Sequence, residues 1–161
     1  MAKIEGEVRI TPSVLDRLID EEPEVSREAP VSRLKSLRQL RSSVKRDLEW
    51  LLNTRRLIDE IPEDLKEVRD SLLMFGLPDF TSANVSSLAD QNKVRRLVES
   101  AIERFEPLLK DVTVTVERGR EFERSLHFRI SANLQVDPAP EPVAFDTTLR
   151  PWNAEFEIQA S

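Results

Sequence analysis

The chain has 161 residues and a mass of 18.5 kDa, the size of one ordinary domain, and 39% of its residues are apolar. It contains 24 Lys and Arg residues against 30 Asp and Glu residues, which gives a formal net charge of −6. The absence of cysteine excludes disulfides and thiolate chemistry, and the three scattered glycines exclude a phosphate-binding glycine loop. The first residues form no apolar signal-peptide core, and the run at 72–77 is far shorter than the about 20 residues that span a bilayer. We therefore expect a soluble, cytoplasmic protein.

Residues 1–30 are predicted to form an acidic N-terminal arm and linker. They carry 4 basic and 8 acidic side chains. Residues 11–19 can form one short amphipathic helix, and residues 23–30 have the composition of a linker. We therefore expect residues 31–161 to form a single folded domain.

Residues 31–56 form a basic island, with 8 basic and 2 acidic side chains. Apolar residues recur here at spacings of three and four, which predicts a helix over about 32–53 with Ser32 as its N-cap. Arg38, Arg41 and Lys45 share a polar face, which is either merely solvated or binds an acidic partner. The net charge and the lack of a base-reading or stacking motif favour an acidic protein surface over nucleic acid. The predicted apolar face consists of Val31, Leu34, Leu37, Leu40, Val44, Leu48, Leu51 and Leu52.

Two more helical segments follow the basic island. The first is predicted from residue 62 to about 74, and residues 76–80 are predicted to form a turn that tucks two apolar side chains under the domain. Ser87 and Asp90 resemble a capping box, which predicts a second long helix that ends before Pro107. The apolar stripe of this helix consists of Val94, Leu97, Val98, Ala101, Ile102 and Phe105.

After residue 110 the apolar period changes to 2, which predicts strands with one buried face and one solvated face. Such strands are typical of an antiparallel sheet, and the helices are expected to cover its apolar face. The predicted fold class is α+β, with N-terminal helices packed on one face of a C-terminal three- to four-stranded antiparallel sheet. The open edges of such a sheet can accept a strand from another chain. The alternating runs are 112–117, 126–136, 143–149 and 156–158.

The sequence contains no pattern that predicts catalysis. His127, the only histidine, falls on the solvated face of a predicted strand, where a lone histidine is usually just hydrated. Glu103 and Glu106 lie one helical turn apart, but a chain with 30 acidic residues always contains such pairs. We therefore expect no enzymatic activity, no cofactor and no metal site.

Several segments together resemble the TssE baseplate subunits of bacterial type VI secretion systems. The longest is 32–56, which closes with the quite specific run Asn53-Thr54-Arg55-Arg56. The TssE family is similar to the wedge protein of contractile phage tail baseplates, which was once described as lysozyme-like. The other segments that carry the resemblance are 10–18, 75–80, 102–109 and 145–147.

The resemblance implies a structural role at a membrane-docked baseplate. Family members join the TssF and TssG subunits in baseplate wedges and dock the first ring of the contractile sheath. A Glu-Pro-Arg motif ends the second long helix in this family; Glu106 and Pro107 match it, whereas Leu108 replaces the arginine. Together with the basic helix face, the resemblance suggests as partner-binding residues Glu106, Pro107, Arg38, Arg41, Lys45, Arg55 and Arg56.

The older description of the family leaves one alternative, a lysozyme-like hydrolase that degrades peptidoglycan. Such an enzyme would need two carboxyl groups facing each other across a cleft, and Glu103 and Glu106 are the pair that the sequence offers.

Overall fold

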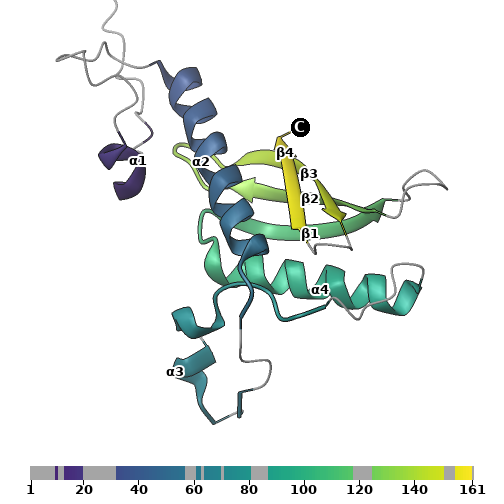
Figure 1. The fold of residues 1–161 in the computed structure, drawn as a ribbon. Helices are drawn as coiled ribbons and strands as arrows, with labels where there is room; N and C mark the ends of the chain where they lie inside the picture. The colour runs from purple at the N-terminus through teal and green to yellow at the C-terminus, as the bar shows by residue number, and fades with distance from the viewer. Residues whose placement is uncertain are drawn as a thin grey trace, which may run out of the picture.

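The computed structural model (Figure 1) describes nine helices and strands. In chain order they are α1 (Val14–Leu18), α2 (Arg33–Asn53), α3 (Lys66–Arg69), the 3-10 helix η1 (Leu72–Met74), α4 (Leu88–Phe105), β1 (Leu109–Glu117), β2 (Leu126–Leu134), β3 (Glu141–Arg150) and β4 (Glu155–Ala160). The predicted linker at 23–30 lies outside the described residues. Those residues are 10, 13–19, 32–56, 61–62, 64–69, 71–80, 87–117, 125–150 and 155–160.

The four strands form one antiparallel sheet in the order β1-β2-β3-β4, which confirms the predicted α+β class. Alternate residues of the strands are buried, as the period of 2 predicts. Helix α2 packs against β4 and helix α4 packs against β1, so the two long helices cover the apolar face (Figure 1). The strands β1 and β4 are the two edges of the sheet. On the central strand β2 the buried residues are Leu126, Phe128, Ile130, Ala132 and Leu134.

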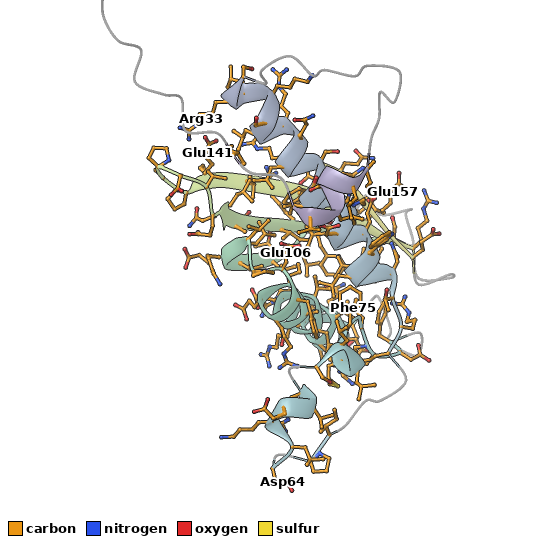
Figure 2. All side chains as sticks on the ribbon, turned by 90° about the vertical axis from the view of Figure 1, so that its left-hand side faces the viewer. Arg33, Asp64, Phe75, Glu106, Glu141 and Glu157 are labelled. Atoms are coloured by element: carbon orange, nitrogen blue, oxygen red, sulfur yellow. The ribbon has the colours of Figure 1, made fainter. Side chains whose placement is uncertain are left out.

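Helix α2 confirms the helix predicted over 32–53. Ser32 caps it, because the Ser32 Oγ accepts a hydrogen bond from the Lys35 N–H at 3.4 Å. The prediction that Leu34 belongs to the buried face is wrong, since this side chain is 70% exposed. The physical reason is that the start of α2 extends past the sheet, and burial along this helix begins only at Ser36 and Leu37 (Figures 1 and 2). The buried residues of α2 are Ser36, Leu37, Leu40, Val44, Leu48, Leu51 and Leu52.

The prediction of one helix over 62–74 is wrong, because the structure contains two short helices there. Ser71 lies between α3 and η1. Its hydroxyl donates to the carbonyl oxygen of Val68 at 2.7 Å and accepts from the Leu73 N–H at 3.3 Å. A serine side chain that bonds nearby main-chain groups competes with continuous helical hydrogen bonding, which explains the interruption.

Helix α4 begins and ends as predicted. The Ser87 Oγ accepts a hydrogen bond from the Asp90 N–H at 3.4 Å, and Glu106 is the C-terminal cap ahead of Pro107. The predicted apolar stripe is confirmed, because four of its residues are buried and two are partly buried against the core. These six residues are Val94, Val98, Ala101, Ile102, Leu97 and Phe105.

The predicted turn at 76–80 is confirmed and lies against the end of α2. Leu77 and Phe80 are buried. The Leu77 N–H donates to the Thr54 carbonyl oxygen at 2.9 Å, and the Arg56 N–H donates to the Leu77 carbonyl oxygen at 3.0 Å. Gly76 has a φ of +98°, and a Cβ atom at this position would lie only 2.4 Å from the Thr54 carbonyl oxygen.

We therefore expect Gly76→Ala to lower the free energy of unfolding by at least about 2 kcal/mol, because the alanine would combine an unfavourable φ with a main-chain clash. Urea denaturation measures this. Ser42→Ala, at an exposed position of α2, is the control and should change stability by no more than about 0.5 kcal/mol. A Gly76→Ala protein as stable as the control would contradict the described turn.

Candidate partner-binding surfaces

The side chain of Asn53, at the end of α2, binds the main chain of the edge strand β4. The Asn53 Nδ2 donates to the Phe156 carbonyl oxygen at 2.9 Å, and the Asn53 Oδ1 accepts from the Phe156 N–H at 2.8 Å. The carboxamide thus takes the place of a residue in a neighbouring strand. Since the main-chain groups of Phe156 point away from β3, those of Ile158, two residues further on, point the same way.

Arg55 and Arg56, two of the predicted partner-binding residues, are half-buried beside this helix end. The Arg55 guanidinium lies over the Phe80 ring, 4.6 Å from its centroid, and its Nη1 donates to the Leu52 carbonyl oxygen at 3.2 Å. Burial lowers the pKa of Arg55, and the charge of Asp79 opposes this shift. Arg55 therefore contributes to packing inside the domain.

The predicted basic residues Arg38, Arg41 and Lys45 follow one another along α2, but they differ in their contacts. The Arg41 Nη2 lies 3.8 Å from Glu141, and the Lys45 Nζ lies 3.3 Å from Glu49. Arg38 is exposed, and within the described residues its side chain has no ion pair. Together with the exposed Leu34 one turn earlier, these side chains at 34, 38, 41 and 45 form a row that we call the basic row.

Glu106 lies where the end of α4 meets β1, and it is only 7% exposed (Figure 2). Burial, and to a smaller extent the charge of Asp47 on α2, raise its pKa to about 7, although a hydrogen bond from the main chain of Leu108 opposes this. Pro107 is exposed, whereas the Leu108 side chain packs against the core. Sequence reasoning did not predict the burial of Glu106, because the helix pattern alone places it at a solvated C-terminus.

The other edge strand, β1, is partly closed by a side chain of α4. The Glu99 Oε1 accepts a hydrogen bond from the Val114 N–H at 3.2 Å, and the Arg95 Nη1 donates to the Glu99 Oε2 at 3.0 Å. The register of β1 against β2 also shifts near Asp111, whose φ is +53°. A bulge and a carboxylate at an edge both hinder strand addition, so β1 is protected at its start and near its middle.

A groove of about 490 Å³ lies beside the start of β4, and no sequence pattern predicts it. Trp50 lines the groove and is 59% exposed, and an exposed tryptophan is a frequent anchor of protein interfaces. The groove joins residues from the end of α2 with residues near the chain's C-terminal end, a proximity that periodicity does not reveal. Its lining residues are Glu49, Trp50, Asn53, Arg150, Glu155, Phe156 and Glu157.

A comparison with known protein families matches residues 38–139 to the family described as baseplate wedge protein gp25. The matched segment runs from α2 into the connection between β2 and β3, and it covers more than half of the chain. The chain belongs to the gp25 family of baseplate wedge proteins. Membership confirms the resemblance that the sequence motifs predict. No curated protein matches the chain.

As a gp25-family protein, the chain is a structural component of a phage tail-like baseplate and works in contact with other baseplate proteins. None of the helices in the described part of the chain is long and apolar enough to cross a membrane. The features that can serve such contacts in this gp25-family chain are the edge of β4 with its groove, the basic row, and the region around Glu106.

His127 lies on β2 between two hydroxyl groups. His127 is half-buried rather than merely solvated, because its ring nitrogens lie 3.2 Å from Ser125 Oγ and 3.2 Å from Thr148 Oγ1. Among the described residues no three His, Cys, Asp or Glu side chains are grouped so that they could hold a metal ion.

We expect Asn53→Ala to lower the free energy of unfolding by about 2 kcal/mol, because two main-chain groups of Phe156 lose their partner. Thermal or urea denaturation measures this. Asn92→Ala is the matched control, since the Asn92 side chain bonds only the Leu88 carbonyl oxygen of its own helix and is exposed. Equal stability of the two variants would contradict a structural role for the Asn53 carboxamide.

We expect the free energy of unfolding to fall as the pH rises from about 4.5 to about 7, by on the order of 2–3 kcal/mol. The raised pKa means that the folded chain keeps the Glu106 proton in this window, whereas the unfolded chain releases it. Stability is thus greatest below the unfolded pKa and is lost as the pH passes through the folded pKa.

Glu106→Gln should therefore flatten the dependence of stability on pH in that window. Glu103→Gln, at an exposed position of α4, should keep the wild-type profile. Urea denaturation at several pH values compares the three proteins. If Glu106→Gln follows the wild-type profile, the carboxyl group of Glu106 is not buried as described.

Proposed function

We propose that this chain is the TssE-type wedge subunit of a bacterial type VI secretion baseplate. In this role it joins the TssF and TssG subunits and docks the first ring of the contractile sheath, at a cytoplasmic baseplate beside the membrane. Family membership supports the wedge role, and the motifs at 10–18 and 32–56 support the type VI assignment. The observation that carries the docking function is the edge of β4, where Asn53 pairs with Phe156 and no other described side chain is seen to bond the outward main-chain groups.

The sheath docks, in this proposal, by adding a strand to the edge of β4. A strand that begins beyond Asn53 can pair with the outward-pointing main-chain groups of Ile158 and Ala160. The groove beside Asn53, with its exposed Trp50, offers room for side chains of the added segment. The edge of β1 is less suited, since a bulge and the Glu99 carboxylate already protect it.

Ala160→Pro tests this docking. At an outward-facing edge position, proline removes only the N–H that points away from the sheet, so pairing of β4 with β3 is kept. We expect the thermal unfolding temperature to stay almost unchanged and sheath assembly to be lost. Fluorescence microscopy of a labelled sheath in cells measures the assembly. Ala160→Val is the control and should assemble sheath normally. Normal sheath assembly with Ala160→Pro would overturn docking at this edge.

The wedge partners, in this proposal, bind the basic row and the region around Glu106. Arg38 supplies a charge that no other described side chain neutralises, which favours an acidic partner surface. Near Glu106 lies Asp47, whose negative charge Arg46 already balances in part. A cationic partner side chain placed over the exposed Pro107 and the partly exposed Asp47 would balance that charge further. Arg55 and Arg56 contribute through their exposed parts.

Arg38→Glu tests the basic row with little risk to the fold. We expect its affinity for a co-expressed TssF–TssG complex to be weaker by roughly tenfold or more, because a like charge then faces the acidic partner. Isothermal titration calorimetry measures this, and the difference in affinity between the variant and wild type should become smaller at high salt. Arg96→Glu, at an exposed position of α4, is the matched control and should bind like wild type. Equal affinities would mean that the basic row is merely solvated.

We also propose that the chain has no hydrolase activity. The carboxyl pair that the alternative needs would have to face a common cleft. Glu103 is exposed on α4, whereas Glu106 is buried beside Asp47. Neither residue lines the groove beside β4, and this placement supports a structural role for both.

A further inference from the structure

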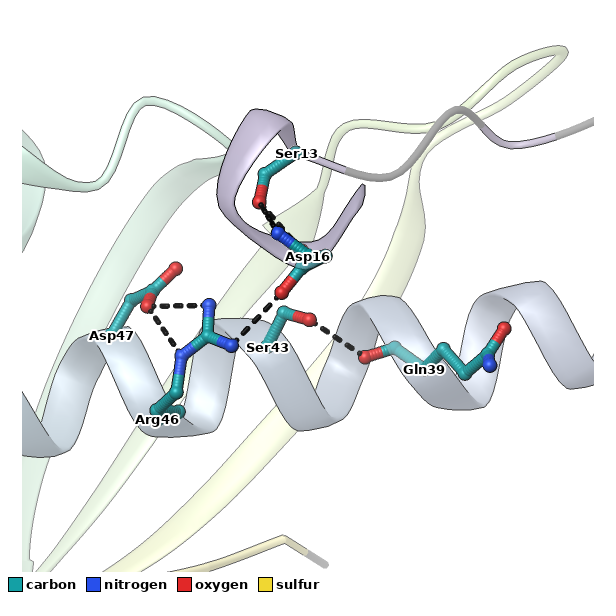
Figure 3. Close-up of polar contacts among 6 residues, drawn as sticks. All are labelled: Ser13, Asp16, Gln39, Ser43, Arg46 and Asp47. Carbon is teal, nitrogen blue, oxygen red and sulfur yellow. Dashed lines mark hydrogen bonds and ion pairs between the residues drawn. The ribbon is translucent and has the colours of Figure 1, made fainter. Parts of the chain in front are cut away.

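Helix α1 is attached to α2 by its polar side (Figure 3). The Asp16 carboxylate lies 2.9 Å from the Arg46 guanidinium, and Arg46 also pairs with its neighbour Asp47 at 3.0 Å. Ser13 caps α1, because its Oγ accepts the Asp16 N–H at 3.1 Å, and its hydroxyl donates to the Asp16 carboxylate at 2.6 Å. Just before the helix, Ile10 is partly buried against the core.

Asp16 is held in its charged form at this contact. Partial burial raises its pKa, but hydrogen bonds from Ser13, Ser43 and Arg46, together with the Arg46 charge, outweigh burial and bring the pKa below its ordinary value. A five-residue helix is not stable alone in water, so this ion pair and its cap hold α1 in place.

The apolar side of α1 points to solvent. The side chains of Val14 and Leu18 are 73% and 77% exposed, and Leu15 and Ile19 are exposed as well. Val14, Leu15 and Leu18 have the spacing i, i+1 and i+4, so they lie on one helix face, and Ile19 follows directly after the helix as its C-cap. A surface helix normally buries its apolar face and exposes its polar face, and α1 does the reverse. An exposed apolar face on a helix that is already ordered suits the binding of a partner, because little conformational entropy is lost.

We infer that the apolar face of α1, formed by Val14, Leu15 and Leu18 and continued by Ile19 just after the helix, docks into an apolar groove bordered by basic side chains on a neighbouring baseplate subunit. This inference rests on the proposed wedge function. The helix supplies the apolar anchors of a helix-in-groove contact. The sequence directly after α1 is acidic, so a partner that binds here is expected to carry positive charge. The acidic residues within five positions of Ile19 are Asp20, Glu21, Glu22 and Glu24.

The same acidic residues argue against two other occupants of this face. A second copy of the chain would bring two acidic segments together, and a membrane surface with anionic lipids would repel them. A partner with an apolar groove and a basic rim complements both the apolar face of α1 and the acidic residues that follow it.

Leu18→Asp tests the inference, with Leu72→Asp as the matched control. Both leucines are exposed, at 77% and 83%, so neither substitution should change the thermal unfolding temperature. The probe is a co-expressed, purified TssF–TssG complex in 0.15 M salt, titrated with the full chain in a calorimeter. We expect Leu18→Asp to bind at least roughly tenfold more weakly than wild type, and Leu72→Asp to bind like wild type.

The outcomes separate this inference from the proposed function. Absence of binding by the wild-type chain would overturn the wedge proposal and this inference with it. Binding by wild type and Leu18→Asp with equal affinity would overturn the inference and leave the wedge proposal standing. Sedimentation equilibrium gives a further check, because a dimer of the wild-type chain that Leu18→Asp dissociates would assign the face to self-association instead.

Val14→Asp should weaken binding in the same way, since it lies on the same face. Arg46→Gln removes the ion pair with Asp16 that holds α1 against α2, and it leaves the apolar face unchanged. Arg46→Lys preserves the positive charge. We expect Arg46→Gln to weaken binding severalfold and Arg46→Lys to restore part of the loss. Unchanged affinity in Arg46→Gln would mean that the pre-formed position of α1 does not contribute.

Discussion

The contact between the Asn53 carboxamide and the main chain of Phe156 fixes the end of α2 against the edge of the sheet. It joins two segments that are 103 residues apart in the sequence, and it satisfies two main-chain groups that would otherwise lack a partner in the folded chain. Immediately after it, Thr54 and Arg56 pair with Leu77, so the turn at 76–80 is held by the same helix end. The position of α2 over β4, and the burial of Leu77 and Phe80, depend on this short stretch of chain.

The two edges of the sheet differ in how far their main-chain groups are covered. A carboxylate and a bulge protect β1, whereas a single carboxamide covers part of β4 and leaves the outward groups further along directed away from the sheet. The helices cover the apolar face, so the features left for partners lie at the periphery. They are the β4 edge, the basic row along α2, and the exposed apolar face of α1. This distribution suits a subunit that touches several neighbours at once.

Periodicity and capping predicted most of the fold. The stripes of α2 and α4 and the alternation of the four strands are properties of the local sequence, and Ser32 and Ser87 mark helix starts by their own hydrogen bonds. Predictions that depended on tertiary position failed. Leu34 fits the apolar stripe but is 70% exposed at the start of α2, and the helix over 62–74 is interrupted at Ser71 by side-chain hydrogen bonds. The roles of Asn53 and Trp50 could not be predicted, since their partners lie on β4, far away in the sequence. The burial of Glu106 depends likewise on how α4 meets its neighbours.

Amide hydrogen exchange, measured on the isolated chain and on the chain assembled with sheath, tests the central claim most directly. The account predicts that the Phe156 N–H exchanges slowly in both states, because Asn53 always bonds it. The Ile158 N–H should exchange quickly in the isolated chain and slowly once a sheath strand has been added. An Ile158 N–H that exchanges at the same rate in both states would contradict the claim that β4 is the edge on which the sheath docks.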